Sequence, residues 1–461
     1  MTASRVIPLA LLLSAVLAAA PAPAGAVFGP PAELARGPFG TTVVAATDRA
    51  GATTAVLVDG GAPQRVQRPG SAAPWGAPQP LPGRGLGHAS GPVVAAAGQG
   101  AAAIAWRIDT PKKYMSIAAM VRDPGGAFDA PVVVSPADAG GVRHPAVAID
   151  AGGRALLAYN TNTRAVHLSL RGAIAVALRG AHGSFGPPEV VDEHPSAAPA
   201  AAIGADGRGV VAWVRDRRVW AVSVDVEARR IGRPTAVTRA GSYQSVRVAA
   251  GTGGAATIAF RARRGRRATD PYAVTTLRRP AGGRFERTPR YVETLGRRGF
   301  LRDLAIAADD DGWTALTWSP EDFGGARDTG VNGVTSDVRV ATARPGQATF
   351  GAVRVVAERG RTLCETPAIA AAAGRAFLAW SCRDRRTVSV FGATVGATRA
   401  ATVTTILGPQ AQPSGFVAPG AVTAGLDAAG TATVVAVRAD PPAAGGPPAP
   451  TTLRVLAVSG R

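Results

Sequence analysis

One short sequence phrase occurs eight times along this chain of 461 residues. Each copy is a short apolar run, a turn that contains glycine, and a second apolar run that ends in a bulky residue. Successive copies end 49, 53, 54, 47, 58, 62 and 57 residues apart, at Leu57, Trp106, Tyr159, Trp213, Phe260, Trp318, Trp380 and Val437. A repeat of this length constrains the fold more than any other feature, because each unit must bury its apolar face against its neighbours.

Each phrase predicts a β-hairpin. Its apolar runs are rich in Val, Ile and Ala and break at glycines such as Gly153 and Gly207, where a tight turn needs a positive φ. Glycine is costly inside a helix, so a helix over the repeated phrase is disfavoured. A third apolar run follows, and then a fourth phrase that contains proline, such as FGPPEVV from Phe185. Proline fits a sheet edge. Four strands at this period predict one β-propeller blade per unit.

The two ends of the chain complement each other. The last unit stops after its third strand, at 453–459, and FGPPAEL from Phe28 is an unpaired copy of the fourth phrase. Pairing the N-terminal strand with the last unit makes every blade whole. We therefore expect an all-β fold, an eight-bladed β-propeller of four-stranded antiparallel blades with the N-terminal strand closing the last blade. Seven blades are the alternative, because the first and last units are poor in aromatic residues.

Residues 1–26 have the pattern of a secretory signal peptide. Arg5 precedes an apolar run over 6–20, and Ala24, Gly25 and Ala26 form a small-residue cleavage site. The run is too short to span a bilayer. We expect cleavage after Ala26, a secreted extracellular protein without a transmembrane segment, and a single propeller domain over 27–461.

The two cysteines, Cys364 and Cys382, flank the seventh hairpin and lie equally far from Ala373 in its turn. They should face each other across two strands, and export makes a disulfide plausible. Two reduced, buried thiols are the alternative interpretation.

The net charge of +20 comes almost entirely from arginine, since the only lysines are Lys112 and Lys113. Together with the abundance of Ala, Gly and Pro, this is the composition that a GC-rich gene produces. An exported protein also rarely meets nucleic acid, so we do not expect nucleic acid as a partner.

The distribution of the arginines is more informative than their number. Thirteen lie between Arg261 and Arg302, and the runs RARRGRR and GRRGFLR fall in loops that should emerge on one face of a blade. A basic loop face could bind an anionic polysaccharide or a cell-surface protein. Solvated arginines that keep a β protein soluble are the alternative. The candidate ligand-binding residues are Arg261, Arg263, Arg264, Arg266, Arg267, Arg297, Arg298 and Arg302.

No catalytic signature is present in the sequence. The run from Asp309 to Gly312 lacks the alternate spacing of a calcium loop, and it falls on a hairpin turn where Asp and Gly are common. We expect no metal, no cofactor and a monomer. The non-catalytic binding scaffold is our first interpretation. A sialidase-like or lyase-type carbohydrate-active enzyme is the second, using loop carboxylates such as those of the long insertion over 319–337.

The repeat also carries a family resemblance. The segments PAVAIDAGGRALLAY from Pro145 and GGAFDAP from Gly125 resemble the repeats of exported bacterial β-propeller proteins of uncharacterised type. Such repeats are remotely similar to those of sialidase propellers. The sialidase Asp-box needs a Ser, an Asp, a Gly and a Trp at fixed spacing, and Asp206 with Gly207 lacks both the Ser and the Trp. The resemblance therefore implies a fold and no activity.

Overall fold

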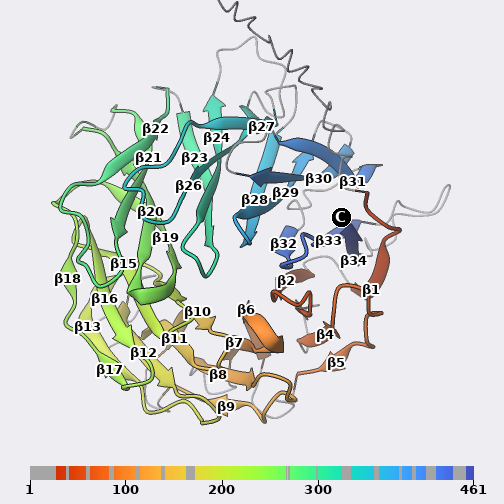
Figure 1. The fold of residues 1–461 in the computed structure, drawn as a ribbon, viewed down its shortest axis with the longest axis horizontal. Coiled ribbons are helices and arrows are strands. Elements are labelled where there is room, and N and C mark those ends of the chain that lie inside the picture. The colour runs from red at the N-terminus through yellow and green to blue at the C-terminus, as the bar shows by residue number, and fades with distance from the viewer. Residues whose placement is uncertain are drawn as a thin grey trace, which may run out of the picture.

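The computed structural model of the chain is a ring of eight antiparallel β-sheets around a central axis (Figure 1). It describes residues 27–37, 41–58, 63–81, 88–109, 115–135, 141–161, 172–265, 267, 270–296, 299–323, 334–357, 363–383, 387–396, 401–411, 422–439 and 453–460. The eight-bladed propeller expected from the repeat is confirmed, and the seven-bladed alternative is wrong. The predicted signal peptide lies outside the described residues.

The first four blades follow the chain from the inner strand outwards. Blade 1 comprises β2 (Thr42–Thr47), β3 (Thr53–Val58), β4 (Gln64–Arg68) and β5 (Gln79–Pro80). Blade 2 comprises β6 (His88–Ala96), β7 (Ala102–Asp109), β8 (Met115–Arg122) and β9 (Val132–Val133). Blade 3 comprises β10 (Val142–Ile149), β11 (Ala155–Thr161), β12 (Gly172–Arg179) and β13 (Glu189–Ser196). Blade 4 comprises β14 (Ala200–Ile203), β15 (Arg208–Arg215), β16 (Arg218–Asp225) and the short β17 (Arg230–Ile231) and β18 (Thr235–Ala236).

The remaining blades repeat this order. Blade 5 comprises β19 (Tyr243–Ala250), β20 (Ala256–Arg263), β21 (Tyr272–Arg279) and β22 (Arg290–Thr294). Blade 6 comprises β23 (Gly299–Ala308), β24 (Thr314–Phe323), β25 (Val334–Ser336), β26 (Val338–Ala343) and β27 (Arg354–Ala357). Blade 7 comprises β28 (Leu363–Ala372), β29 (Arg375–Arg383), β30 (Thr387–Gly396) and β31 (Thr402–Ala411). Blade 8 comprises β32 (Val422–Leu426), β33 (Ala432–Ala439) and β34 (Leu453–Gly460).

The N-terminal strand closes the ring. Strand β1 (Ala32–Gly37) is the outermost strand of blade 8 and pairs antiparallel with β34, with Ala32 opposite Ala457. Upstream of β1, Phe28 forms an isolated bridge with Gly460. The closure predicted from the two chain ends is therefore confirmed. Within the described residues, no helix is long and apolar enough to cross a membrane.

The hydrophobic core lies in layers between neighbouring blades. The bulky residues that end the repeated phrase sit on the second strands, and Trp213, Trp318 and Trp380 are fully buried there. The cluster around Trp380, for example, joins Val338 and Val340 of blade 6 to Leu378 of blade 7. Burial of a large aromatic side chain at this position in blades 2 to 7 stabilises the ring. The predicted disulfide also forms, because Cys364 and Cys382 are directly opposed on β28 and β29.

A buried aspartate organises several of the turns that join the first and second strands. Asp48 and Asp309 each accept the backbone N–H four residues later through Oδ1, at 2.8 and 2.9 Å. Through Oδ2 they accept an N–H from the neighbouring blade, from Gly100 at 2.6 Å and from Gly374 at 2.8 Å. One carboxylate thus fixes its own turn and ties two blades together.

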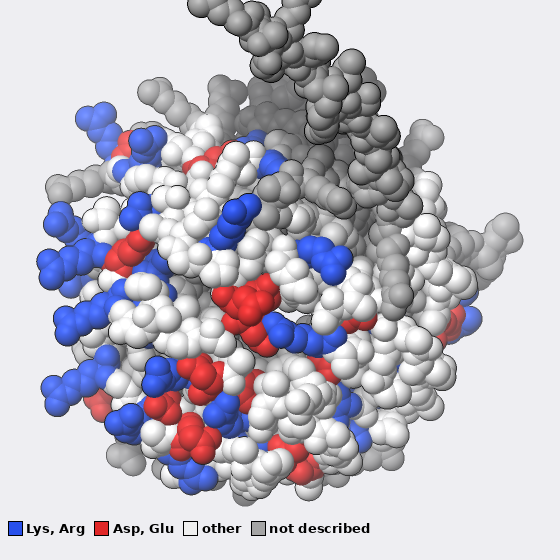
Figure 2. Space-filling view, viewed as in Figure 1, with Lys and Arg blue, Asp and Glu red and all other residues white. Residues whose placement is uncertain are grey.

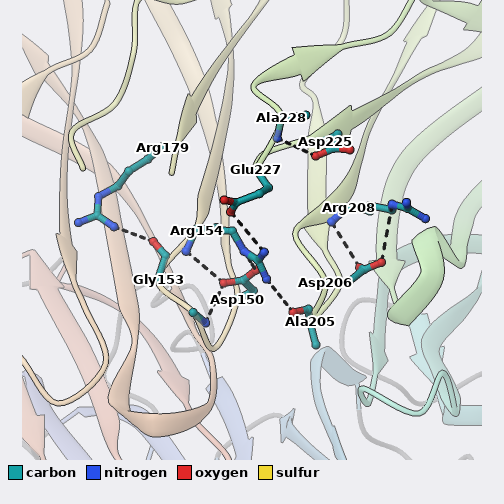
Figure 3. A network of polar contacts seen from close by, with 11 residues as sticks. Asp150, Gly153, Arg154, Arg179, Ala205, Asp206, Arg208, Asp225, Glu227 and Ala228 are labelled. Carbon is teal, nitrogen blue, oxygen red and sulfur yellow. Dashed lines mark hydrogen bonds and ion pairs between the residues drawn. The ribbon is translucent and has the colours of Figure 1, made fainter. Parts of the chain in front are cut away.

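Blade 3 achieves the same link through an arginine. Asp150 holds Arg154 at 2.7 Å, and Arg154 donates to the carbonyl of Ala205 in blade 4 at 2.9 Å (Figure 3). On the same face, Arg49 of blade 1 and Asp310 of blade 6 form an ion pair of 2.8 Å. The acidic turns therefore serve the cohesion of the ring. Among the described residues, no group of three or more His, Cys, Asp or Glu side chains is arranged to hold a metal ion.

Candidate anion-binding groove between blades 4 and 5

An arginine at the end of the third strand recurs in blades 1, 2, 3 and 5. Arg122, Arg179 and Arg279 each donate to the carbonyl of a glycine in the first turn of their own blade, at 2.6, 2.6 and 2.7 Å. These acceptors are Gly100, Gly153 and Gly254, which all have a positive φ. The arginine therefore supports the turn on which the first hairpin depends.

An aromatic side chain six residues later covers two of these guanidinium groups. Arg122 lies 5.3 Å from the ring centre of Phe128, and Arg279 lies 5.2 Å from that of Phe285. This contact gives the aromatic residue of the fourth phrase a function, since a guanidinium over an aromatic face is stabilised by the ring quadrupole.

The counter-charge of this arginine differs between blades. In blade 3, Arg179 forms ion pairs with Asp123 at 2.8 Å and Asp129 at 3.2 Å, both from blade 2. In blade 5, Arg279 instead donates to the hydroxyl of Ser223 in blade 4. No carboxylate among the described residues lies within 4 Å of Arg279, although this side chain is only 8% exposed. Burial lowers the pKa of Arg279, and the charge of Asp206 opposes that effect. Arg279 is therefore a buried cation without an ion-pair partner in the described part of the chain.

Arg279 lies at the floor of a groove between blades 4 and 5. Two adjoining hollows of about 600 and 440 Å³ share Ser223, Gly232, Arg279 and Gly283 in their walls. We call this feature the blade 4/5 groove. Five arginines line the larger hollow and three line the smaller, with Arg279 common to both. The seven are Arg208, Arg230, Arg233, Arg239, Arg279, Arg284 and Arg287.

The two carboxylates of the groove do not neutralise this charge. Glu286 accepts from Arg290 at 3.1 Å, and Asp225 accepts from the backbone of Ala228 at 2.9 Å while pairing loosely with Arg230. Figure 2 shows basic side chains projecting from the rim on the side where Figure 1 places β16, β18, β21 and β22. With seven arginines against two acids, the groove is a strongly positive surface. The exposed arginines that have no ion pair among the described residues are Arg233, Arg239, Arg284 and Arg287.

The loop arginines predicted from the sequence lie elsewhere, and half of them are described. Arg261 is only 6% exposed, donates to the carbonyl of Leu301 at 2.7 Å and lies over the rings of Tyr272 and Phe300. Arg263 donates to the hydroxyl of Tyr272 at 2.6 Å. Arg264 and Arg267 are exposed. The binding role of this loop surface stays a prediction. Arg266, Arg297 and Arg298 lie outside the described residues, as does the side chain of Arg302.

The carboxylates considered for an enzyme are described in part. Glu365 is buried and pairs with Arg383 at 3.3 Å, and Asp337 is buried and pairs with Arg339 at 2.9 Å. Glu321 is also buried. Most of the long insertion of blade 6, including Asp328, lies outside the described residues.

The blade 4/5 groove was not found by the sequence analysis. The arginine runs drew attention to the loops at 261–267 and 296–302, whereas the groove combines 208–239 with 279–287. The repeat position gives no signal either. Asp225 follows Val224, which pairs with Gly209, just as Asp123 follows Arg122, which pairs with Ala102, so blade 4 also carries an aspartate at this position.

The chain is distantly similar to solved structures of other proteins. No protein-family model matches the chain, and no curated protein matches it. Among solved structures, a protein of unknown function from Dyadobacter fermentans DSM 18053 is 14% identical, with a TM-score of 0.39 over 69% of this chain and 95% of its own. The polysaccharide lyase Uly1 is 10% identical, with a TM-score of 0.44 over 77% and 87%. A Hadza microbial sialidase is 14% identical, with a TM-score of 0.36 over 74% and 71%.

Proposed function

We propose that this chain is an exported binding propeller that holds an acidic polymer, such as an anionic polysaccharide, in the blade 4/5 groove without transforming it. The observation that carries the proposal is the excess of seven arginines over two carboxylates in one groove. Guanidinium groups bind carboxylate and sulfate oxygens through paired hydrogen bonds, and they keep their charge at every physiological pH.

The shape of the groove favours a polymer over a small ligand. Its arginines extend from Arg208 near the first turn of blade 4 to Arg239 and Arg287 at the outer end. A single small anion could neutralise only a few of these charges. A polymer with an anionic group on successive units could contact several of these arginines at once. Such multivalent binding gives a higher affinity than any single contact.

Two observations support binding rather than turnover. The described carboxylates of the alternative hypothesis, Glu365 and Asp337, are buried in ion pairs with arginine. A glycosidic general acid must instead reach the substrate and exchange its proton. The groove itself offers Glu286 and Asp225, and both already accept hydrogen bonds.

Binding of purified protein to polygalacturonate, heparin, neutral dextran and duplex DNA tests the proposal. We expect saturable binding to an acidic polysaccharide that weakens as salt rises, no binding to dextran, and no change in polymer length on prolonged incubation. Shortening of the polymer, or equal binding to DNA, would contradict the proposal.

Two matched variants locate the surface. The R233Q/R239Q/R284Q/R287Q variant removes four exposed groove arginines and should weaken binding at least tenfold. The R217Q/R218Q/R264Q/R267Q variant removes the same charge from exposed loop residues and should bind within about threefold of the parent, since dispersed surface charge contributes little. Equal losses, or a larger loss in the loop variant, would show that the groove is not the site.

A further inference from the structure

Arg279 has more hydrogen-bond donors than its surroundings use. A guanidinium carries five N–H groups. Its Nε–H goes to the carbonyl of Gly254 at 2.7 Å, and Nη1 donates to Ser223. Nη2 has no acceptor among the residues that the structure describes. Arg68, the buried arginine at the same place in blade 1, differs because its Nη1 and Nη2 donate to hydroxyls of Ser459, Thr53 and Thr433.

The unused donors of Arg279 are held in a fixed orientation. The bond to Gly254 anchors one edge of the guanidinium, and the ring of Phe285 lies 5.2 Å from its centre on one side. The side chain is more than nine-tenths buried, yet it forms part of the wall of both hollows of the groove. Nη2 is not among the fully enclosed side-chain nitrogens of the described residues, so it keeps some contact with solvent in the groove. A ligand oxygen at Nη2 would therefore accept a charge-assisted hydrogen bond from a donor that no described protein group uses.

Blade 3 shows what this position looks like when the protein supplies the anion itself. Asp123 reaches Arg179 from the preceding blade, 56 residues earlier, at 2.8 Å, and Asp129 adds a second carboxylate. Ser223 reaches Arg279 from the preceding blade with a neutral hydroxyl. The residue of blade 4 at the repeat position of Asp123 is Asp225, but its carboxylate accepts from the backbone of Ala228 and pairs with Arg230 instead of Arg279. The groove adjoins both Ser223 and Arg279.

We infer that Arg279 and Ser223 form a discrete subsite for one oxyanion group, a carboxylate or a sulfate ester, carried by the acidic polymer of the proposed function. The group takes the place that Asp123 occupies at Arg179. Arg279 donates to it from its terminal nitrogens, and the Ser223 hydroxyl, which accepts from Nη1, keeps its own proton to donate. This inference rests on the proposed function and adds an anchoring point with a defined chemistry to an otherwise diffuse positive surface.

The decisive variant is S223D, which gives Arg279 an internal carboxylate. We expect this variant to be more stable to heat than the parent, because a buried cation gains a partner, and to bind at least tenfold more weakly, because the subsite is filled. The S223N variant is the matched control, with a similar size and no charge. It should show no gain in thermal stability and a smaller loss of affinity than S223D, because Arg279 gains no carboxylate partner. A gain in thermal stability alongside a loss of affinity cannot arise from misfolding.

The probes are a galacturonate tetramer, which carries carboxylates, and a sulfated glycosaminoglycan tetramer, each measured by calorimetry. A tenfold loss in S223D for one probe but not for the other identifies the oxyanion as carboxylate or sulfate. Unchanged binding of both probes by S223D overturns the subsite. If the parent protein binds neither a tetramer nor an acidic polymer, the proposed function fails instead, so the two failures are distinguishable.

Discussion

At the scale of single residues, the aspartates of the first turns show how a short side chain can link neighbouring sheets. Asp309 is buried and accepts N–H groups from Trp313 in its own blade and Gly374 in the next. Asp311 lies in the same turn but is exposed. Both residues are aspartates, so their position in the turn decides which one is buried and hydrogen-bonded.

This contrast gives a prediction with an internal control. Replacing Asp309 by Ala should destabilise the protein by about 2–4 kcal/mol, because two backbone N–H groups lose a charged acceptor. Replacing Asp311 by Ala should change the stability by less than about 0.5 kcal/mol. Urea denaturation followed by tryptophan fluorescence measures both. Equal effects would mean that the cross-blade hydrogen bonds do not contribute.

The ion pair of Asp123 with Arg179 predicts a dependence of stability on pH. Burial would raise the pKa of Asp123, but the hydrogen bond and charge of Arg179, with help from His182, hold it below its ordinary value of 3.8. A lowered pKa in the folded state means that the carboxylate stabilises the protein above pH 4, and that this contribution disappears as the pH falls through the folded-state pKa.

Replacing Asp123 by Asn should therefore reduce the free energy of unfolding at pH 7 by about 2 kcal/mol, since Arg179 loses a charged partner. The difference in the free energy of unfolding between parent and variant should become smaller as the pH is lowered below 4. Melting curves from pH 7 to pH 2.5 measure this difference, and the exposed E227Q variant serves as the control. A difference that stays constant over this range would contradict the assignment.

At the scale of structural elements, the hairpins could be predicted because their signals are local. Glycines such as Gly153 and Gly207 have the positive φ that their turns require, and the apolar runs beside them become the paired strands. The cysteine pairing was equally local, because Cys364 and Cys382 are symmetric about one turn.

The groove could not be recognised in the same way, because it depends on Arg279 having no carboxylate partner among the described residues. Nothing near Arg279 in the sequence distinguishes it from Arg179, and both preceding blades have an aspartate at the same repeat position. The difference lies in the partner of that aspartate, since Asp123 pairs with Arg179 whereas Asp225 pairs with Arg230. The outer strand of blade 4 is also split into β17 and β18, and the intervening residues form one wall of the groove. The sequence alone does not determine such a split.

The disulfide between β28 and β29 should contribute measurable stability. It closes a loop with a sequence separation of 18 residues. The loss of chain entropy in the unfolded state for a loop of this length corresponds to about 3 kcal/mol. We expect the C364A/C382A variant to unfold at a lower temperature by calorimetry. The parent treated with reductant should then approach the double variant, and a variant as stable as the oxidised parent would contradict the prediction.

At the scale of the whole molecule, closure by β1 should govern the stability of the entire ring. Leu34 of β1 is buried with Val455 of β34 and Leu57 of blade 1. Removing residues 27–37 would expose the edge of β34 and open the layer between blades 8 and 1. We expect a chain that starts at residue 38 to melt at a markedly lower temperature and to aggregate. Adding a synthetic peptide of residues 27–37 should restore part of the loss. A truncated chain with unchanged melting would contradict this role.

The placement of the closing strand also imposes an order on assembly. Strand β1 pairs with β34, which lies far later in the sequence. Seven sheets draw all their strands from residues 42–411, but the eighth needs both β1 and residues 453–460. The ring therefore closes only after β34 has been synthesised, and β1 lacks its strand partner until then.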